Sequence, residues 1–305
     1  MNRRTFIEQI GFGFGLVISV AGSRAAAQSG RVGGEQSPRA HLTVIAQVPA
    51  PDTPPIRLTP TDMTLYDAGT EQIIESVEPD PSAAVIVFLA DNSATFQVEV
   101  GDMEQLARSL IRELFTGDRL MLVGYAKEPE ILCELTEDAS RLIAGAKLFR
   151  KRSTPRLYDA LLAVTEDVFR PATTVSKRVI VLLSDGYDEG SQTTFEDALA
   201  ALQSVDVVLY AWQAQDRTYG APRPKRLGPK PVEVIRRLTE DTGGRAFRLD
   251  ETNAAAILTD EVRRRWFTVR YVPQPAVTTT AGRLLLVAGD PQMTLRTKKR
   301  RLPRR

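Results

Sequence analysis

Two carboxylates and several hydroxyl groups follow directly after apolar runs in this sequence. Residues 83–90 and 179–183 are unbroken apolar runs. The polar side chains that come after them are Asp91, Ser93, Thr95 and Asp185. Side chains spaced two apart on one loop can converge on one ion, and carboxylate and hydroxyl oxygens are ligands that suit Mg²⁺ or Mn²⁺. The pattern predicts a divalent-metal site built from these four residues.

A third loop adds another hydroxyl group to this set. Thr154 precedes Pro155 and a predicted helix over 155–169, and it is the fifth candidate ligand of the metal. The same pair also suits a helix start, with Thr154 as the N-cap and Pro155 at the first helical position. For Asp91 and Asp185 too, the alternative to ligation is a purely structural role, as caps or turns at the strand ends. Ligation and capping both remain open on the sequence alone.

The elements that must position these residues are strands and helices in alternation. The runs 83–90, 179–183 and 205–212 are typical of strands buried on both faces. Between them, apolar residues recur at helical spacing, as over 103–115. This alternation predicts an α/β fold with a doubly wound, mostly parallel central sheet and helices on both faces. Ligands of such sheets bind at the carboxyl ends of the strands, where the polar residues stand.

These motifs, in this order, resemble the von Willebrand factor type A (vWA) domain family. The resemblance covers about residues 82–273 and is closest to a bacterial exported vWA-related family. The segments that carry it are Asp91–Thr95, Leu157–Leu161, Leu182–Asp188, Glu240–Phe247 and Phe267–Pro273, with a preface at Asp62–Asp67. The resemblance implies a metal-ion-dependent adhesion site. In it, Asp91 and Asp185 would be the acidic ligands and Ser93 and Thr95 the hydroxyl ligands of Mg²⁺ or Mn²⁺, and an acidic residue of a partner protein would complete the shell.

Two departures from the family pattern bear on this site. The third position of the first motif is Thr95 where the family has serine, which keeps the hydroxyl group. The middle loop has Pro155 where the family has threonine, with Thr154 one step early. Basic residues also flank this loop, namely Lys151, Arg152 and Arg156. These changes predict weaker metal binding, or its loss.

Two basic segments are expected at the surface. The loop 215–230 leaves the carboxyl end of a predicted central strand, so it should rim the site, either as an electrostatic guide for an acidic partner or as an ordinary solvated loop. Its basic residues are Arg217, Arg223, Lys225, Arg226 and Lys230. In the tail, 296–305, seven of ten residues are Lys or Arg. A solvated end is expected there, with contact to an anionic envelope surface as the alternative.

The chain divides into five segments. Residues 1–27 resemble a twin-arginine signal peptide, with Arg3-Arg4 at the start, a short apolar stretch and small residues before Gln28. We therefore expect export to the periplasm or the cell exterior, and no transmembrane span, because the apolar stretch is too short. The other segments are a flexible Pro-rich lead-in (28–57), a β-rich preface (58–81), the vWA-like domain (82–273), and a C-terminal strand with the basic tail (274–305).

Composition narrows the function classes. A net charge of +2 is too balanced for a nucleic-acid binder. The single cysteine, Cys133, excludes an intrachain disulfide and is expected to be a small buried hydrophobe. The single histidine, His41, lies in a Pro-rich flank, which excludes a Ser-His-Asp triad near the core and a multi-histidine zinc site.

We therefore expect an exported, non-enzymatic protein-binding module that docks an acidic residue of its partner onto a metal ion. One alternative is a metal-free scaffold that keeps the fold and has lost the site. The other is a metal-dependent hydrolase or phosphoryl-transfer enzyme, which needs a nucleophilic carboxylate and an acid/base partner. Ser93 stands where the second acid of such an enzyme is expected, which disfavours this alternative.

Overall fold

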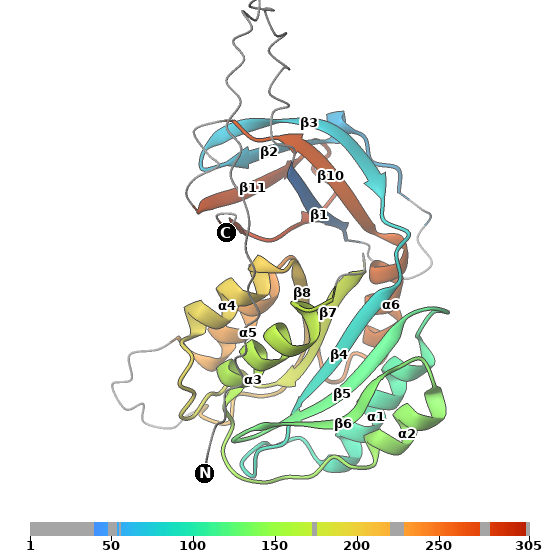
Figure 1. The fold of residues 1–305 in the computed structure, drawn as a ribbon, viewed down its shortest axis with the longest axis vertical. Helices are drawn as coiled ribbons and strands as arrows, with labels where there is room; N and C mark the ends of the chain where they lie inside the picture. Colours follow the sequence, from blue (N-terminus) through green and yellow to red (C-terminus); the bar gives the residue numbers. More distant parts are fainter. Residues whose placement is uncertain are drawn as a thin grey trace, which may run out of the picture. The chain divides into compact units, whose positions relative to one another are not determined.

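The computed structural model describes residues 40–47, 54, 56–172, 176–219, 229–274 and 281–302. A six-stranded sheet has the strand order β6-β5-β4-β7-β8-β9 (Figure 1). Its strands are β4 (Ala84–Asp91), β5 (Arg119–Tyr125), β6 (Pro129–Thr136), β7 (Lys177–Ser184), β8 (Val207–Gln213) and β9 (Ala246–Arg248). Neighbouring strands are parallel, except that β5 and β6 are antiparallel. This confirms the predicted mostly parallel sheet.

Helices cover both faces of this sheet (Figure 1). One face carries α1 (Val100–Arg112), α2 (Ala139–Ala146) and α6 (Ala254–Arg264); the other carries α3 (Leu157–Val164), α4 (Phe195–Ser204) and α5 (Pro231–Glu240). A π-helical segment, η2 (Thr165–Phe169), continues α3. In β4, Phe88 packs into the first core and Val87 into the second. Because side chains alternate along a strand, burial on both faces requires a fully apolar run.

The order of the strands places a switch point between β4 and β7. The chain passes from β4 through α1 to β5 on one side, whereas β7 pairs with the other side of β4. Loops that leave two adjacent strands in opposite directions open a crevice at their carboxyl ends. Asp91 ends β4 and Asp185 follows β7, so both acids lie at this crevice.

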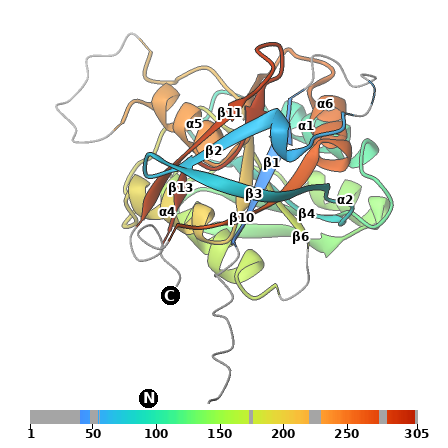
Figure 2. The same ribbon diagram turned by 90° about the horizontal axis from the view of Figure 1, so that it is seen from above.

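A second sheet is antiparallel and has the order β12-β1-β10-β3-β2-β11-β13. Its elements are β1 (Ala40–Ala46), β2 (Met63–Asp67) after the 3-10 turn η1 (Pro60–Asp62), β3 (Thr70–Pro79), β10 (Trp266–Val272), β11 (Gly282–Ala288), β12 (Leu295–Arg296) and β13 (Arg300–Arg301). Figure 2 shows β3 between β2 and β10. The preface and the C-terminal strand, far apart in the sequence, therefore belong to one sheet.

The structure corrects the prediction that 28–57 is a flexible lead-in, because residues 40–46 of it form β1. This strand pairs with β10 from Ala40↔Tyr271 to Ile45↔Trp266. Leu42 and Val44 are buried against Phe267 and Val269 in the core of the antiparallel sheet. Apolar burial and a partner strand outweigh the disorder-prone composition around this segment.

The basic tail also differs from the expected solvated end, since four of its cations are paired. Lys298 lies 2.5 Å from Asp206, and Lys299 lies 3.1 Å from Glu240 and 3.2 Å from Asp241. Arg296 pairs with the buried Glu261, and Arg301 with the buried Asp67. These partners are spread along the chain, so no local pattern marks them. The tail over 296–301 is thus part of the folded unit, which leaves less free charge for an anionic surface.

Candidate functional site

The two acids are held in place by their own backbone turns. An Asp91 carboxylate oxygen accepts a hydrogen bond from Ser93 N at 2.8 Å, and an Asp185 oxygen accepts one from Tyr187 N at 3.0 Å. Both carboxylates are buried. Gly186 is required in the second turn, because its φ is +84° and a Cβ there would lie 2.2 Å from the carbonyl oxygen of Pro231. The turns therefore aim both carboxylates into the crevice.

The guanidinium of Arg217 fills the point on which these side chains converge. Its Nε and Nη2 donate to the two oxygens of Asp185 at 2.7 and 3.0 Å, a bidentate pair. Nη1 donates to Ser93 Oγ at 2.9 Å and to Thr95 Oγ1 at 2.7 Å, and Nη2 also donates to Asp91. A guanidinium has five N–H groups, so each has an acceptor. The side chain is only 6% exposed.

Two aromatic rings flank the same guanidinium. Its central carbon lies 5.3 Å from the ring centre of Phe96 and 5.2 Å from that of Tyr187, within the range of cation–π attraction. The loop that carries the arginine is fixed as well. Arg217 N donates to Asp185 at 3.0 Å, and Ala214 N donates to the carbonyl of Ser184 at 3.0 Å. We call Asp91, Ser93, Thr95, Phe96, Asp185, Tyr187 and Arg217 the arginine cluster.

The electrostatics of the cluster are those of buried, paired charges. Burial raises the pKa of Asp91 above its ordinary value, and the opposing attraction of Arg217 does not cancel this shift. Burial acts to lower the pKa of Arg217, but hydrogen bonds and attraction from Asp185 and Asp91 outweigh burial, so the pKa lies above its ordinary value. Arg217 therefore stays a cation at every physiological pH. With both carboxylates ionised, the cluster carries a net charge of −1.

Thr154 stands apart from the other four predicted ligands. It is exposed, and it is not among the acceptors of Arg217 in the described part of the chain. The predicted capping role of Thr154 is wrong, because α3 begins at Leu157 with Arg156 as its N-cap. The first amides of α3 are capped from another loop: Tyr158 N donates to Asp188 and Asp159 N to Ser191, each at 3.2 Å.

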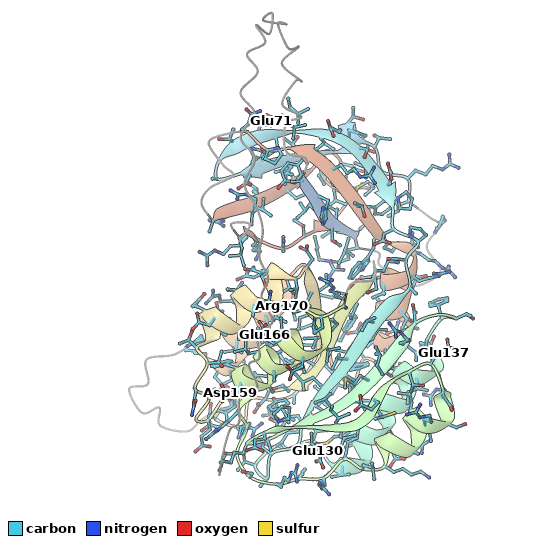
Figure 3. All side chains as sticks on the ribbon, viewed as in Figure 1. Glu71, Glu130, Glu137, Asp159, Glu166 and Arg170 are labelled. Atoms are coloured by element: carbon cyan, nitrogen blue, oxygen red, sulfur yellow. The ribbon has the colours of Figure 1, made fainter. Side chains whose placement is uncertain are left out.

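Two of the basic residues near Thr154, Lys151 and Arg152, have partners outside the cluster. Lys151 lies 3.4 Å from Glu99. Arg152 lies 2.7 Å from Glu130, which also binds Arg150 and is labelled in Figure 3. The cation that reaches the site is Arg217, which sequence reasoning placed in a loop at the rim. The signal was the position of that loop after a central strand, but the sequence did not show that its first arginine turns inward.

These residues, as arranged here, do not fit a divalent ion. Their oxygens are of the type that binds Mg²⁺, but Asp91, Ser93, Thr95 and Asp185 each bind the guanidinium instead. An ion and the guanidinium cannot share that position. Across the described ranges, no group of three or more His, Cys, Asp or Glu residues could hold a metal ion elsewhere.

A groove of about 870 Å³ opens beside the arginine cluster. Its wall is formed by α1, by the segments after β4 and β8, and by the segment before α6, and includes Gln97, Gln105, Arg112, Ala214, Gln215 and Glu251. Gln97 follows Phe96 directly, and Gln215 lies two residues before Arg217. The groove and the cluster therefore share the loops at this edge of the sheet.

Comparison with known proteins identifies the fold. The family model of the von Willebrand factor type A domain matches residues 86–260. Similar solved structures include an aerotolerance-related membrane protein from Bacteroides fragilis, at 14% identity and a TM-score of 0.44, over 59% of this chain and 98% of that chain. BatB, a conserved hypothetical protein from Bacteroides thetaiotaomicron, has 17% identity and a TM-score of 0.46 over 59% and 97%. A von Willebrand factor type A protein from Catenulispora acidiphila has 14% identity and a TM-score of 0.48 over 80% and 74%. No curated protein matches the chain.

Proposed function

Because the chain belongs to the von Willebrand factor type A domain family, we propose that it is an exported, non-enzymatic module that binds another protein at the carboxyl ends of β4 and β7. Domains of this family are interaction modules. The observation that carries the proposal is the convergence of Asp91, Ser93, Thr95 and Asp185 on one buried cation at the switch point. Open α/β sheets bind their ligands at this edge, and the groove beside the cluster offers room for a protein segment.

The cation of the resting module is proposed to be Arg217. A carboxylate of the partner would need an open coordination position on a metal ion, or a free N–H group on the arginine. All five N–H groups of Arg217 have acceptors. Docking of an acidic residue onto Mg²⁺ or Mn²⁺ therefore requires that Arg217 first leaves the site. The geometry favours the metal-free form, with the partner seated in the groove.

A non-enzymatic role is supported by where the reactive side chains lie. His41, the single histidine, is in β1 opposite Arg270 in the antiparallel sheet, and Cys133 is buried in β6. Neither is positioned beside the paired carboxylates. Asp91 and Asp185, the acids that a phosphoryl-transfer enzyme would use, both accept hydrogen bonds from Arg217, which lowers their nucleophilicity.

Export is proposed from residues 1–27, which lie outside the described residues. Within the described ranges, no helix has the length and apolarity needed to cross a membrane. Replacing Arg3 and Arg4 by lysine should retain the precursor inside the cell, because the paired arginines are the feature of the signal that is recognised. Fractionation of a tagged full-length chain measures this. Unchanged export of the double variant would contradict the twin-arginine assignment.

Partner binding is tested by blocking the groove. Gln105 is an exposed residue of α1 that lines it, so Gln105→Trp should obstruct this part of the groove without changing the cluster. Lys147→Trp, at the exposed end of α2, is the matched control. Envelope extracts of the source organism are passed over immobilised wild-type chain and both variants. We expect one protein to be retained by the wild type and the control and lost with Gln105→Trp. Equal retention of the partner by the wild type and both variants would show that the binding surface does not lie at this edge of the sheet.

A further inference from the structure

We propose that the site is built for a guanidinium ion, that its resident ligand is Arg217 of the same chain, and that it selects this planar monocation over a divalent metal ion. This departs from the metal site that the sequence predicts. It rests on the cluster alone and does not depend on whether the groove binds a partner.

The acceptors match a guanidinium in number and layout. One carboxylate, Asp185, takes the fork of Nε and Nη2, while Ser93 and Thr95 take both protons of Nη1. Asp91 takes the remaining proton of Nη2. A lysine ammonium presents three donors from a single point and cannot reach this set. This layout of acceptors therefore suits a planar, forked ligand.

The aromatic rings favour the same ligand. Phe96 and Tyr187 lie within cation–π distance of the guanidinium carbon, and Phe96 is buried. Guanidinium is weakly hydrated and stacks readily on aromatic faces. Mg²⁺ loses its water shell reluctantly and is usually bound with several waters retained. Apolar rings beside the cation leave less room for those waters, so they disfavour the metal ion.

Charge acts in the opposite direction. A divalent ion would neutralise both Asp91 and Asp185, whereas one guanidinium leaves a net charge of −1. The arginine has a compensating advantage, because the bonds of Ala214 N and Arg217 N fix its loop at the site. A ligand tethered on a short segment acts at an effective concentration of about a millimolar or more, which a free ion must exceed. Tether and geometry together should therefore outweigh the charge difference.

Chemical rescue of an emptied site tests this selectivity. In the full chain, Arg217→Ala leaves two buried carboxylates without their cation, so its Tm should fall on the order of 10 °C. Millimolar methylguanidinium should recover part of the lost Tm, whereas methylammonium, Mg²⁺ and Mn²⁺ should not. Arg237→Ala is the matched control, because Arg237 also pairs with a carboxylate, Glu196, and stacks on a ring, Phe195, but at the surface. No ion should rescue that variant.

Each result decides the question. Rescue of Arg217→Ala by methylguanidinium alone supports the proposal. Rescue by Mg²⁺ or Mn²⁺ to an equal or greater extent overturns the selectivity, and rescue by neither overturns the preformed guanidinium site. If the variant does not fold, calorimetric titration of the wild type with Mg²⁺ decides. Absence of binding is expected, and saturable binding that Asp91→Ala abolishes would overturn the proposal.

Discussion

Two clusters of arginines around buried carboxylates use their charges differently. Arg217 has an acceptor for each of its five N–H groups. In the interior, Arg296 and Arg245 instead share one carboxylate, the fully buried Glu261. There, Arg245 Nε and Arg296 Nε and Nη1 have no hydrogen-bond partner among the described residues. The first cluster is matched donor by donor, as a binding site is, whereas the second is an ion-pair joint.

The difference follows from where the clusters lie. The first is at the carboxyl edge of the sheet, where two strand ends and a loop can each contribute a polar side chain. The second cluster links Glu261 of α6 to Arg296 of β12 and to Arg245, the residue before β9. These ion pairs hold the basic tail against the elements that belong to the six-stranded sheet and its helices. An interior joint of this kind needs only opposite charges that lie close together. A site for one ligand needs directional acceptors as well.

The largest effect should come from removing the carboxylate of the interior joint. Glu261→Gln leaves two arginines without a counter-charge and should cost about 3–5 kcal/mol of unfolding free energy. Urea denaturation measures it. Glu240→Gln is the control, because Glu240 is half-exposed and its ion pairs with Arg236 and Lys299 should be worth at most about 1 kcal/mol. Equal effects of the two substitutions would mean that the ion pairs of Glu261 stabilise the fold no more than a surface pair does.

Within the arginine cluster, the two acids should be unequal. Asp185 binds two N–H groups of the guanidinium and the backbone amide of Arg217, whereas Asp91 binds the guanidinium through one oxygen. Asp185→Asn should therefore cost about 2–4 kcal/mol, and Asp91→Asn about half as much. Parallel urea titrations compare the two variants. A larger loss for Asp91→Asn would show that the bidentate pair does not dominate the cluster.

How far the sequence predicts this site can be judged from the two acids and the arginine. The apolar run of β4 and the polar residues after it are local patterns, so the sheet edge and four side chains of the cluster could be inferred. Arg217 lies more than a hundred residues from Asp91, and its inward turn depends on tertiary packing. Strand β1 was missed for a related reason, since its partner β10 lies far along the chain. The paired lysines of the tail are a third case.

The two threonines that the sequence assigned to the site should behave differently. Thr95→Val removes one hydrogen bond to Arg217 Nη1 and should cost about 1 kcal/mol. Thr154→Ala removes an exposed hydroxyl group outside the cluster and should change stability by less than about 0.5 kcal/mol. Thermal unfolding of both variants checks this. A larger loss for Thr154→Ala would place the middle loop in the site after all.

The ion pair of Arg237 and Glu196 at the surface should contribute a small stability that depends on pH. The hydrogen bond from Arg237 holds the pKa of Glu196 below its ordinary value. A lowered folded-state pKa adds stability above the unfolded pKa, and this contribution is lost as pH falls through the folded pKa. The stability difference between wild type and Arg237→Ala should be about 0.5 kcal/mol at neutral pH and should shrink under acid conditions. A difference that grows on acidification would contradict the sign of this shift.

Crystallography can show directly which cation occupies the crevice. Crystals of the protein grown with excess Mn²⁺ allow anomalous diffraction to locate the metal. We predict guanidinium density between Asp91 and Asp185, with no anomalous peak there. A manganese peak bound by Asp91, Ser93 and Asp185, with Arg217 turned out of the site, would show instead that the crevice is a metal-dependent adhesion site.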